Sequence, residues 1–127
     1  MSDVVIILRL FEGLPHGFDV MCAEAGGEGI RNMAMLRSEV GAPDDPFVDP
    51  GALFAATVGG QLAGVGGVTV QTGLAEPAMR MRRLYVRPTF RRAGVARALA
   101  GAMRGSAPQG EALAGKRLRA NSTSAAS

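Results

Sequence analysis

The sequence predicts one α/β (α+β) domain in which helices flank a sheet, and three observations predict it. Short apolar runs rich in valine and isoleucine are typical of strands. A Gly-Gly pair separates two such runs, as in a two-residue hairpin turn. After Gly94, apolar residues recur at three- and four-residue steps, which is the pattern of an amphipathic helix. A chain of 127 residues can bury a single core but not two, so residues 1–127 are expected to form one domain.

The first part of the chain predicts a strand followed by two helices. Residues 4–10 form a short apolar run that suits a buried strand. Residues 18–25 predict a weak helix, which the glycines after them interrupt. Residues 30–40 carry apolar side chains at helical spacing, with charged residues off that stripe. Residues 41–51 hold three prolines and three aspartates and therefore predict a loop.

Two antiparallel strands are expected next. Residues 52–58 and 61–71 flank the Gly59-Gly60 pair, which suits a hairpin turn. Glycines inside a strand weaken it and indicate a bulge or a close backbone neighbour. The second strand has three of them: Gly64, Gly66 and Gly67.

A third strand leads into a helix through a short turn. Residues 79–86 suit a strand, and Pro88 forbids its continuation. The helix runs from the Gly94 turn to Arg104. Residues 105–115 are expected to be a linker, and residues 116–120 a short strand. The predicted order is strand, helix, helix, strand, strand, strand, helix, strand.

The start of this last helix suits an anion. Backbone amides in a first helical turn lack partners within the helix, and the helix dipole points its positive end outward. Gly94 lets a ligand approach the backbone closely. Arg91 and Arg92 are unfavourable beside a helix N-terminus, and a bound polyanion would reverse that effect. The alternative is that both arginines are simply solvated on a basic face.

Charge is strongly segregated along the chain, although the net charge is only +3. Residues 1–79 hold three arginines and ten acids, whereas residues 80–127 hold eleven basic residues and only one acid, Glu111. The C-terminal part therefore predicts a positive surface that attracts a polyphosphate, either a coenzyme or a nucleic acid.

Other residue types limit the remaining classes of function. No segment has the length of a membrane span, so a cytoplasmic protein without a membrane partner is expected. With Cys22 as the only cysteine, neither an internal disulfide nor a cysteine-based metal site is expected. His16, the only histidine, is interpreted as a loop residue rather than a catalytic base.

The segment from Leu84 to Ala96 resembles the central coenzyme A motif of the GNAT superfamily of acyl-CoA N-acyltransferases. In that motif a strand ends in an apolar residue-x-Val-x-Pro, and Gln/Arg-x-x-Gly-x-Gly/Ala follows. This chain has Leu84-Tyr85-Val86-Arg87-Pro88 and then Arg91-x-x-Gly94-x-Ala96. The predicted element order also matches the GNAT order through its fifth main strand. The resemblance therefore covers nearly the whole chain, but it is specific only in residues 84–96.

This resemblance implies a GNAT-like mixed, mostly antiparallel sheet flanked by helices, with acetyl-CoA as the co-substrate. In the family, the coenzyme enters between the fourth and fifth strands, the backbone of the fourth pairs with the pantetheine arm, and the amides of the following turn hold the pyrophosphate. The cofactor-binding residues that it implies are Leu84, Tyr85, Val86, Arg91, Arg92, Ala93, Gly94, Val95, Ala96 and Asn121.

The chain departs from the GNAT pattern after its fifth predicted strand. Asn121 matches an Asn of the family, but the sequence stops at Ser127, where a Tyr that protonates the departing thiolate would follow. We therefore expect a fold without the C-terminal helix and the last two strands, either as a truncated product or completed by a partner chain. An unpaired edge at residues 116–120 would recruit a second copy, which predicts a homodimer.

The resemblance implies transfer of an acetyl group from acetyl-CoA to a primary amine, carried by a small molecule or a peptide, by direct attack. A backbone amide near Val86 resembles the family's oxyanion donor. The catalytic residues stay open. Glu76 is either a base acting through water or an exposed loop residue, and Tyr85 is either a substitute acid or a structural residue.

Two other functions are weighed beside transfer. The absent C-terminal segment favours an acyl-CoA-binding remnant without turnover. The arginine-rich stripe from residue 80 to 119 favours a nucleic-acid-binding module. That module is disfavoured because only Tyr85 and Phe90 are aromatic in the stripe and no recognition helix is evident.

Overall fold

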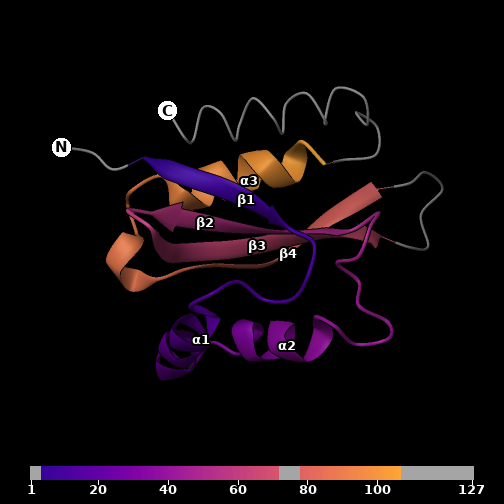
Figure 1. Cartoon of the computed structure of the whole chain (residues 1–127), viewed down its shortest axis with the longest axis horizontal. Helices are drawn as coiled ribbons and strands as arrows, with labels where there is room; N and C mark the ends of the chain where they lie inside the picture. Colours follow the sequence, from indigo (N-terminus) through magenta and orange to yellow (C-terminus); the bar gives the residue numbers. More distant parts are fainter. Residues whose placement is uncertain (1–3, 72–77, 107–127) are drawn as a thin grey trace.

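Three layers make up the part of the chain that the structure describes, which is residues 4–71 and 78–106 of a computed structural model. A four-stranded sheet is the middle layer, with α1 and α2 on one face and α3 on the other (Figure 1). The predicted fold class, an α/β arrangement with helices flanking a mostly antiparallel sheet, is confirmed. The helical segments are α1 (Phe18–Gly27), α2 (Asn32–Glu39), a turn of 3-10 helix (Pro88–Phe90) and α3 (Val95–Arg104).

Each strand runs antiparallel to its neighbour in the order β1-β2-β3-β4. The strands are β1 (Val5–Leu10), β2 (Ala52–Val58), β3 (Gln61–Gln71) and β4 (Ala78–Val86). Gly59 and Gly60 join β2 to β3 with φ values of 58° and 81°, as the hairpin prediction requires.

The predicted boundaries hold to within two residues for every element from β1 to α3. α1 continues through Gly27, two residues beyond the predicted end, and Ile30 N then donates to the Ala25 carbonyl at 2.9 Å. α2 begins at Asn32 rather than residue 30. The glycines after residue 25 thus lie in the last turn of α1 and in the connection to α2, where helical propensity matters least.

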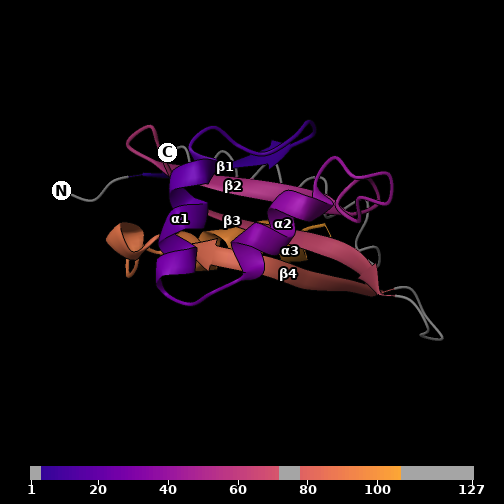
Figure 2. The ribbon, with the colours of Figure 1, turned by 90° about the horizontal axis from the view of Figure 1, so that it is seen from below.

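The sheet divides the hydrophobic core into two clusters, one on each face, because successive strand side chains point to opposite sides. On the α3 side, Ile7, Phe54 and Ala56 pack with Leu99 and Met103. On the other side, the second core consists of residues from α1, α2, β2, β3, β4 and the loop before β2: Phe18, Met21, Ala25, Met33, Leu36, Phe47, Leu53, Ala55, Leu62, Val65 and Tyr85. Figure 2 shows α1 and α2 lying across this second face.

The glycines of β3 have both of the roles predicted for them. The pairing register shifts between Val65 and Gly67, which marks a bulge. A Cβ atom at Gly64 would lie 2.8 Å from the Tyr85 carbonyl oxygen, and one at Gly67 would lie 2.5 Å from Cε1 of Phe47. Neighbouring groups therefore leave no space for a side chain at these two positions.

The described residues end at Ser106. Most of the linker expected at residues 105–115, and all of the strand expected at residues 116–120, therefore lie outside them. No helix in the described ranges is both long and apolar enough to span a membrane.

Candidate functional site

The segment from Arg87 to Gly94, which we call the β4–α3 turn, carries the chain from the end of β4 to the start of α3. Arg87 N donates to the Ala63 carbonyl at 2.8 Å, which is the last backbone bond to β3, and Pro88 then supplies no N–H. Arg92 and Gly94 both have positive φ, at 66° and 80°, so the chain reverses sharply before the helix.

The N-terminus of α3 is open. Its first backbone hydrogen bond runs from Ala98 N to the Gly94 carbonyl at 3.0 Å, so the amides of Val95, Ala96 and Arg97 have no acceptor within the helix. Gly94 makes no side-chain cap, and nothing lies within 4 Å of a Cβ atom placed on it. These amides and the helix dipole form a place where an anion can approach the backbone.

A bulge in β4 precedes the turn. Val65 pairs with Tyr85 and Gly67 pairs with Arg82, so β4 has one residue more than β3 between these pairs. Arg83 lies in this bulge with a φ of 58°. The sequence indicated a bulge through the glycines of β3, but it offered no signal that an arginine of β4 would adopt this conformation.

Helix α2 holds this bulge and the strand after it. Arg83 donates from Nε and Nη2 to Glu39 of α2 at 2.9 and 2.8 Å. Asn32 Nδ2, at the start of α2, donates to the Leu84 carbonyl at 3.1 Å. The side chain of Arg83 is only 11% exposed, so this pair is one of the more buried ion pairs among the described residues.

The outer edge of β4 is the surface that the family resemblance implies for the pantetheine arm. Among the described strands β4 pairs only with β3, so its other edge has no strand beside it. The Leu84 and Val86 carbonyls accept from Asn32 Nδ2 and Arg91 Nε at 3.1 and 3.0 Å, and residues two apart in a strand present their backbone groups to the same side. This edge is therefore occupied by side chains of the protein itself.

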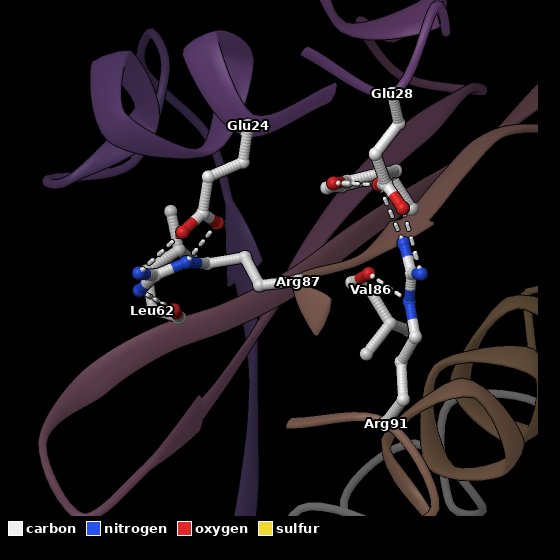
Figure 3. Close-up of polar contacts among 7 residues, drawn as sticks. Glu24, Glu28, Leu62, Val86, Arg87 and Arg91 are labelled. Carbon is white, nitrogen blue, oxygen red and sulfur yellow. Dashed lines mark hydrogen bonds and ion pairs between the residues drawn. The ribbon is translucent and has the colours of Figure 1, made fainter. Parts of the chain in front are cut away.

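Two parallel ion pairs connect the end of α1 to the β4–α3 turn (Figure 3). Glu24 accepts from Arg87 Nε and Nη2 at 2.7 and 3.2 Å. Glu28 accepts from Arg91 Nη2 and Nη1 at 2.7 and 2.9 Å. Arg87 Nη1 also donates to the Leu62 carbonyl at 2.9 Å. The two glutamates are 63 residues away from their arginines, so no local pattern in the sequence indicates these pairs.

Tyr85 completes the second pair. Its side chain is buried in the core beneath α1 and α2, and its hydroxyl donates to Glu28 at 2.6 Å. Hydrogen bonds from Arg91 and then from Tyr85 lower the pKa of Glu28. Burial, followed by the hydrogen bond to Glu28, raises the pKa of Tyr85 to about 12. At neutral pH Glu28 is thus a carboxylate and Tyr85 a phenol that holds its proton firmly, which favours the structural interpretation of Tyr85.

The structure brings most of the predicted site residues together. Tyr85 and Val95 are buried, Leu84 is 40% exposed on the bulge, and Val86 is half-buried. The residues of the turn and helix start that are exposed are Arg91, Arg92, Ala93, Gly94 and Ala96. Glu76 and Asn121 lie outside the described residues.

Some arginines of the predicted basic surface are already paired with carboxylates of the protein. Arg83, Arg87 and Arg91 are paired with carboxylates of α1 and α2. By contrast, Arg92 and Arg97 form no ion pair with any other described residue and are exposed beside the open amides. Within the described part of the chain, two positive charges without an ion-pair partner thus lie at the start of α3, which suits a compact polyanion better than an extended nucleic acid.

A cavity of about 490 Å³ lies on the second face, next to the β4–α3 turn. Val20 of α1, Leu8 of β1 and Leu62 of β3 line it, with Arg87 and the exposed His16 also in its wall. The position of His16 in the loop before α1 agrees with its interpretation as a loop residue.

Comparison with known proteins decides the family. The profile of the Acetyltransferase (GNAT) family matches residues 26–120, well over half of the chain. The chain belongs to the GNAT family. The matched region includes α2, the whole β2-β3-β4 meander and the open start of α3 in this GNAT domain. A comparison with curated proteins found no match.

Solved acetyltransferase structures share the fold of this GNAT domain. A protein from Exiguobacterium sp. 255-15, designated as an acetyltransferase, superposes with a TM-score of 0.65 at 27% identity, over 79% of this chain and 66% of that one. An aminoglycoside acetyltransferase from an uncultured soil metagenomic sample, in complex with sisomicin, has a TM-score of 0.51 at 16% identity, over 80% and 68%. The chain thus spans about two thirds of the length of these structures.

Proposed function

We propose that this GNAT domain binds acetyl-CoA and transfers its acetyl group to a primary amine. The observation that carries the proposal is the open start of α3, placed directly after a β4 edge that has no strand beside it in the described part of the chain. Amides that have no acceptor within the helix suit a pyrophosphate, and so do the two arginines beside them, which form no ion pair with another described residue. Strand-edge carbonyls and amides suit the amide groups of a pantetheine arm.

The proposed reaction is a direct attack. The neutral amine nitrogen forms a bond to the thioester carbonyl carbon, and the carbonyl oxygen becomes an oxyanion that a backbone amide near Val86 stabilises. The carbon–sulfur bond then breaks, coenzyme A leaves as a thiolate that takes a proton, and the new amide loses the extra proton of the attacking nitrogen. The domain contributes mainly by holding the two reactants in position.

No single residue is assigned as the base or the acid of this reaction. The catalytic assignment stays open: Glu76 is a candidate base acting through water, and Tyr85 is a candidate acid. Because Tyr85 has a pKa of about 12 and donates to Glu28, it would have to leave that bond in order to protonate the thiolate. A Tyr85→Phe variant that keeps full kcat would exclude Tyr85 as the acid.

The test combines calorimetry with a thiol-release assay. We expect acetyl-CoA to bind the full chain with one site and thiol to be released when a panel of amines, including an aminoglycoside and a polyamine, is added. Binding without release for any amine would support the acyl-CoA-binding remnant instead. Absence of binding would refute the proposed function.

Two further parts of the proposal concern the oligomeric state and the cellular compartment of the enzyme. We infer a homodimer formed through the strand expected at residues 116–120, and a monomer in sedimentation would refute it. We also propose that the protein acts in the cytoplasm, which fractionation of the source cells tests.

A further inference from the structure

We propose that Glu28 and Arg91 form a latch across the coenzyme edge of β4, and that the coenzyme must open this latch in order to bind. The proposal rests on the proposed function, since it concerns the same edge. The latch consists of one arginine that holds a strand carbonyl with one nitrogen and a helix-end carboxylate with the two others.

The coenzyme and Arg91 compete directly for one acceptor. Arg91 Nε donates to the Val86 carbonyl at 3.0 Å, and this carbonyl points away from β3. The proposed pantetheine contact is to the backbone of residues 84–86 on the same side. An amide N–H of the pantetheine arm and Arg91 Nε would therefore need the same oxygen.

Glu28 fixes Arg91 in this closed position. The carboxylate accepts from both Nη atoms, at 2.9 and 2.7 Å, so the guanidinium is held against the C-terminal end of α1 (Figure 3). In this position the Arg91 guanidinium pairs with Glu28 and does not bind a ligand at the start of α3. Opening the latch would expose the Val86 carbonyl and free a positive charge beside the proposed pyrophosphate position.

The latch is weak enough to open. The side chains of Arg91 and Glu28 are 43% and 31% exposed, and an ion pair as exposed as this contributes little in water. Removing it should change the affinity for a competing ligand by about two- to fivefold, which is the range expected for exposed pairs. Such a latch modulates coenzyme binding without preventing it.

The neighbouring pair provides a matched control. Glu24 and Arg87 have the same chemistry and join the same helix to the same turn. However, the third contact of Arg87 is the Leu62 carbonyl of β3, and no contact with a β4 carbonyl is found for its guanidinium among the described residues. Glu24→Gln therefore removes an equivalent charge pair without touching the outer edge of β4.

The experiment measures acetyl-CoA affinity by calorimetry for the wild-type chain, Glu28→Gln and Glu24→Gln. We expect Glu28→Gln to tighten binding by about two- to fivefold and Glu24→Gln not to tighten it. Equal or weaker binding by a Glu28→Gln variant that unfolds as cooperatively as the wild type would overturn the latch. Tightening by both variants would also overturn it, since the effect would then come from net charge alone.

A second readout needs no variant. Tyr85 is the only tyrosine and the chain has no tryptophan, so tyrosine fluorescence reports on the surroundings of Tyr85, which include its bond to Glu28 and the Arg91 guanidinium 5.6 Å from its ring centroid. Adding 4′-phosphopantetheine, which lacks the absorbing adenine, should change this emission as Arg91 leaves Glu28. Unchanged emission with ligand shown by calorimetry to be bound would refute the latch. If neither 4′-phosphopantetheine nor acetyl-CoA binds the wild-type protein, the proposed function itself is refuted.

Discussion

Tyr85 is a residue whose ionisation can be followed in isolation, because no other tyrosine absorbs. Burial and the bond to Glu28 raise its pKa from 10.0 to about 12. In Glu28→Gln the carboxylate is gone, so we expect the titration of tyrosinate absorbance to shift to lower pH, whereas Glu24→Gln should leave it nearly unchanged.

The same shift sets how stability depends on high pH. The folded-state pKa of Tyr85 lies above the unfolded value, so its contribution is fully present below pH 10.0 and is lost as the pH rises through about 12. Chemical unfolding at a series of alkaline pH values measures this. Equal loss of stability in Glu28→Gln over that range would contradict the assignment.

Gly94 is required by its backbone conformation rather than by crowding, since its φ is 80° and no atom lies within 4 Å of the position that a Cβ atom would take. Gly94→Ala should therefore destabilise the protein by about 1–2 kcal/mol. Gly94→Glu should in addition abolish acetyl-CoA binding, because its carboxylate would enter the anion site. Thermal unfolding and calorimetry separate the two effects.

Gly41 is the control for this position. It also has positive φ, at 84°, with nothing within 4 Å, and it lies in the loop after α2. Gly41→Ala should lower stability to a similar extent and leave acetyl-CoA binding intact. Equal loss of binding in the Gly41 variant would show that Gly94 acts only through stability.

At the scale of elements, β3 depends on the absence of side chains at Gly66 and Gly67, opposite the β4 bulge. A Cβ atom at Gly67 would lie 2.5 and 2.6 Å from the ring of Phe47, which is buried and has little freedom to move. At Gly66 the nearest atom, at 2.9 Å, is the end of the flexible Met103 side chain. We expect Gly67→Ala to destabilise by about 1–3 kcal/mol and Gly66→Ala by less than about 1 kcal/mol, measured by denaturant unfolding.

The order of these two losses is the informative result. If Gly66→Ala proved the more damaging, Met103 would have to be fixed more rigidly in the α3 core than the Phe47 ring is in the other core.

The ion pair that joins α2 to the β4 bulge should matter more than the exposed pair between α2 and α1. Glu39 and Arg83 are 23% and 11% exposed, whereas Asp19 and Arg37 are 92% and 49% exposed. Glu39→Gln should therefore lower the free energy of unfolding by about 1–2 kcal/mol, and Asp19→Asn by less than about 0.5 kcal/mol. Urea unfolding at neutral pH compares the two variants.

Acid should weaken the same contact. The hydrogen bond from Arg83 lowers the pKa of Glu39, so its stabilisation is present above the unfolded value of 4.5 and is lost as the pH falls through the lower folded value. The Glu39→Gln variant should lack this part of the acid dependence. If the difference in unfolding free energy between the wild type and Glu39→Gln stays constant down to acid pH, this prediction is wrong.

At the scale of the whole molecule, the sequence predicted the helices and strands well, but it did not predict the ion pairs between them. The strands, the Gly59–Gly60 hairpin and α3 follow from local patterns: apolar alternation, turn glycines and helical spacing. The position of the β4–α3 turn followed from Pro88 and Gly94. These features need no knowledge of the rest of the chain.

The ion-pair network could not be predicted in the same way. The arginines of β4 and the turn look like a free basic surface in sequence, yet three of them are neutralised by Glu24, Glu28 and Glu39. Those partners become visible only when α1 and α2 pack on the second face, because nothing in the local sequence specifies which distant carboxylate an arginine meets.

The place of β1 in the sheet has a consequence for how the chain folds. β2, β3 and β4 are joined in sequence as a meander, but β1 is separated from its partner β2 by residues 11–51, which contain both α1 and α2. Closing that long loop is entropically harder than closing a hairpin, so β1 should join late and open first. Native-state hydrogen exchange should accordingly be faster for Ile6 and Leu8 than for the amides of β2 and β3. The N-terminal strand would then be the segment through which this domain first comes apart.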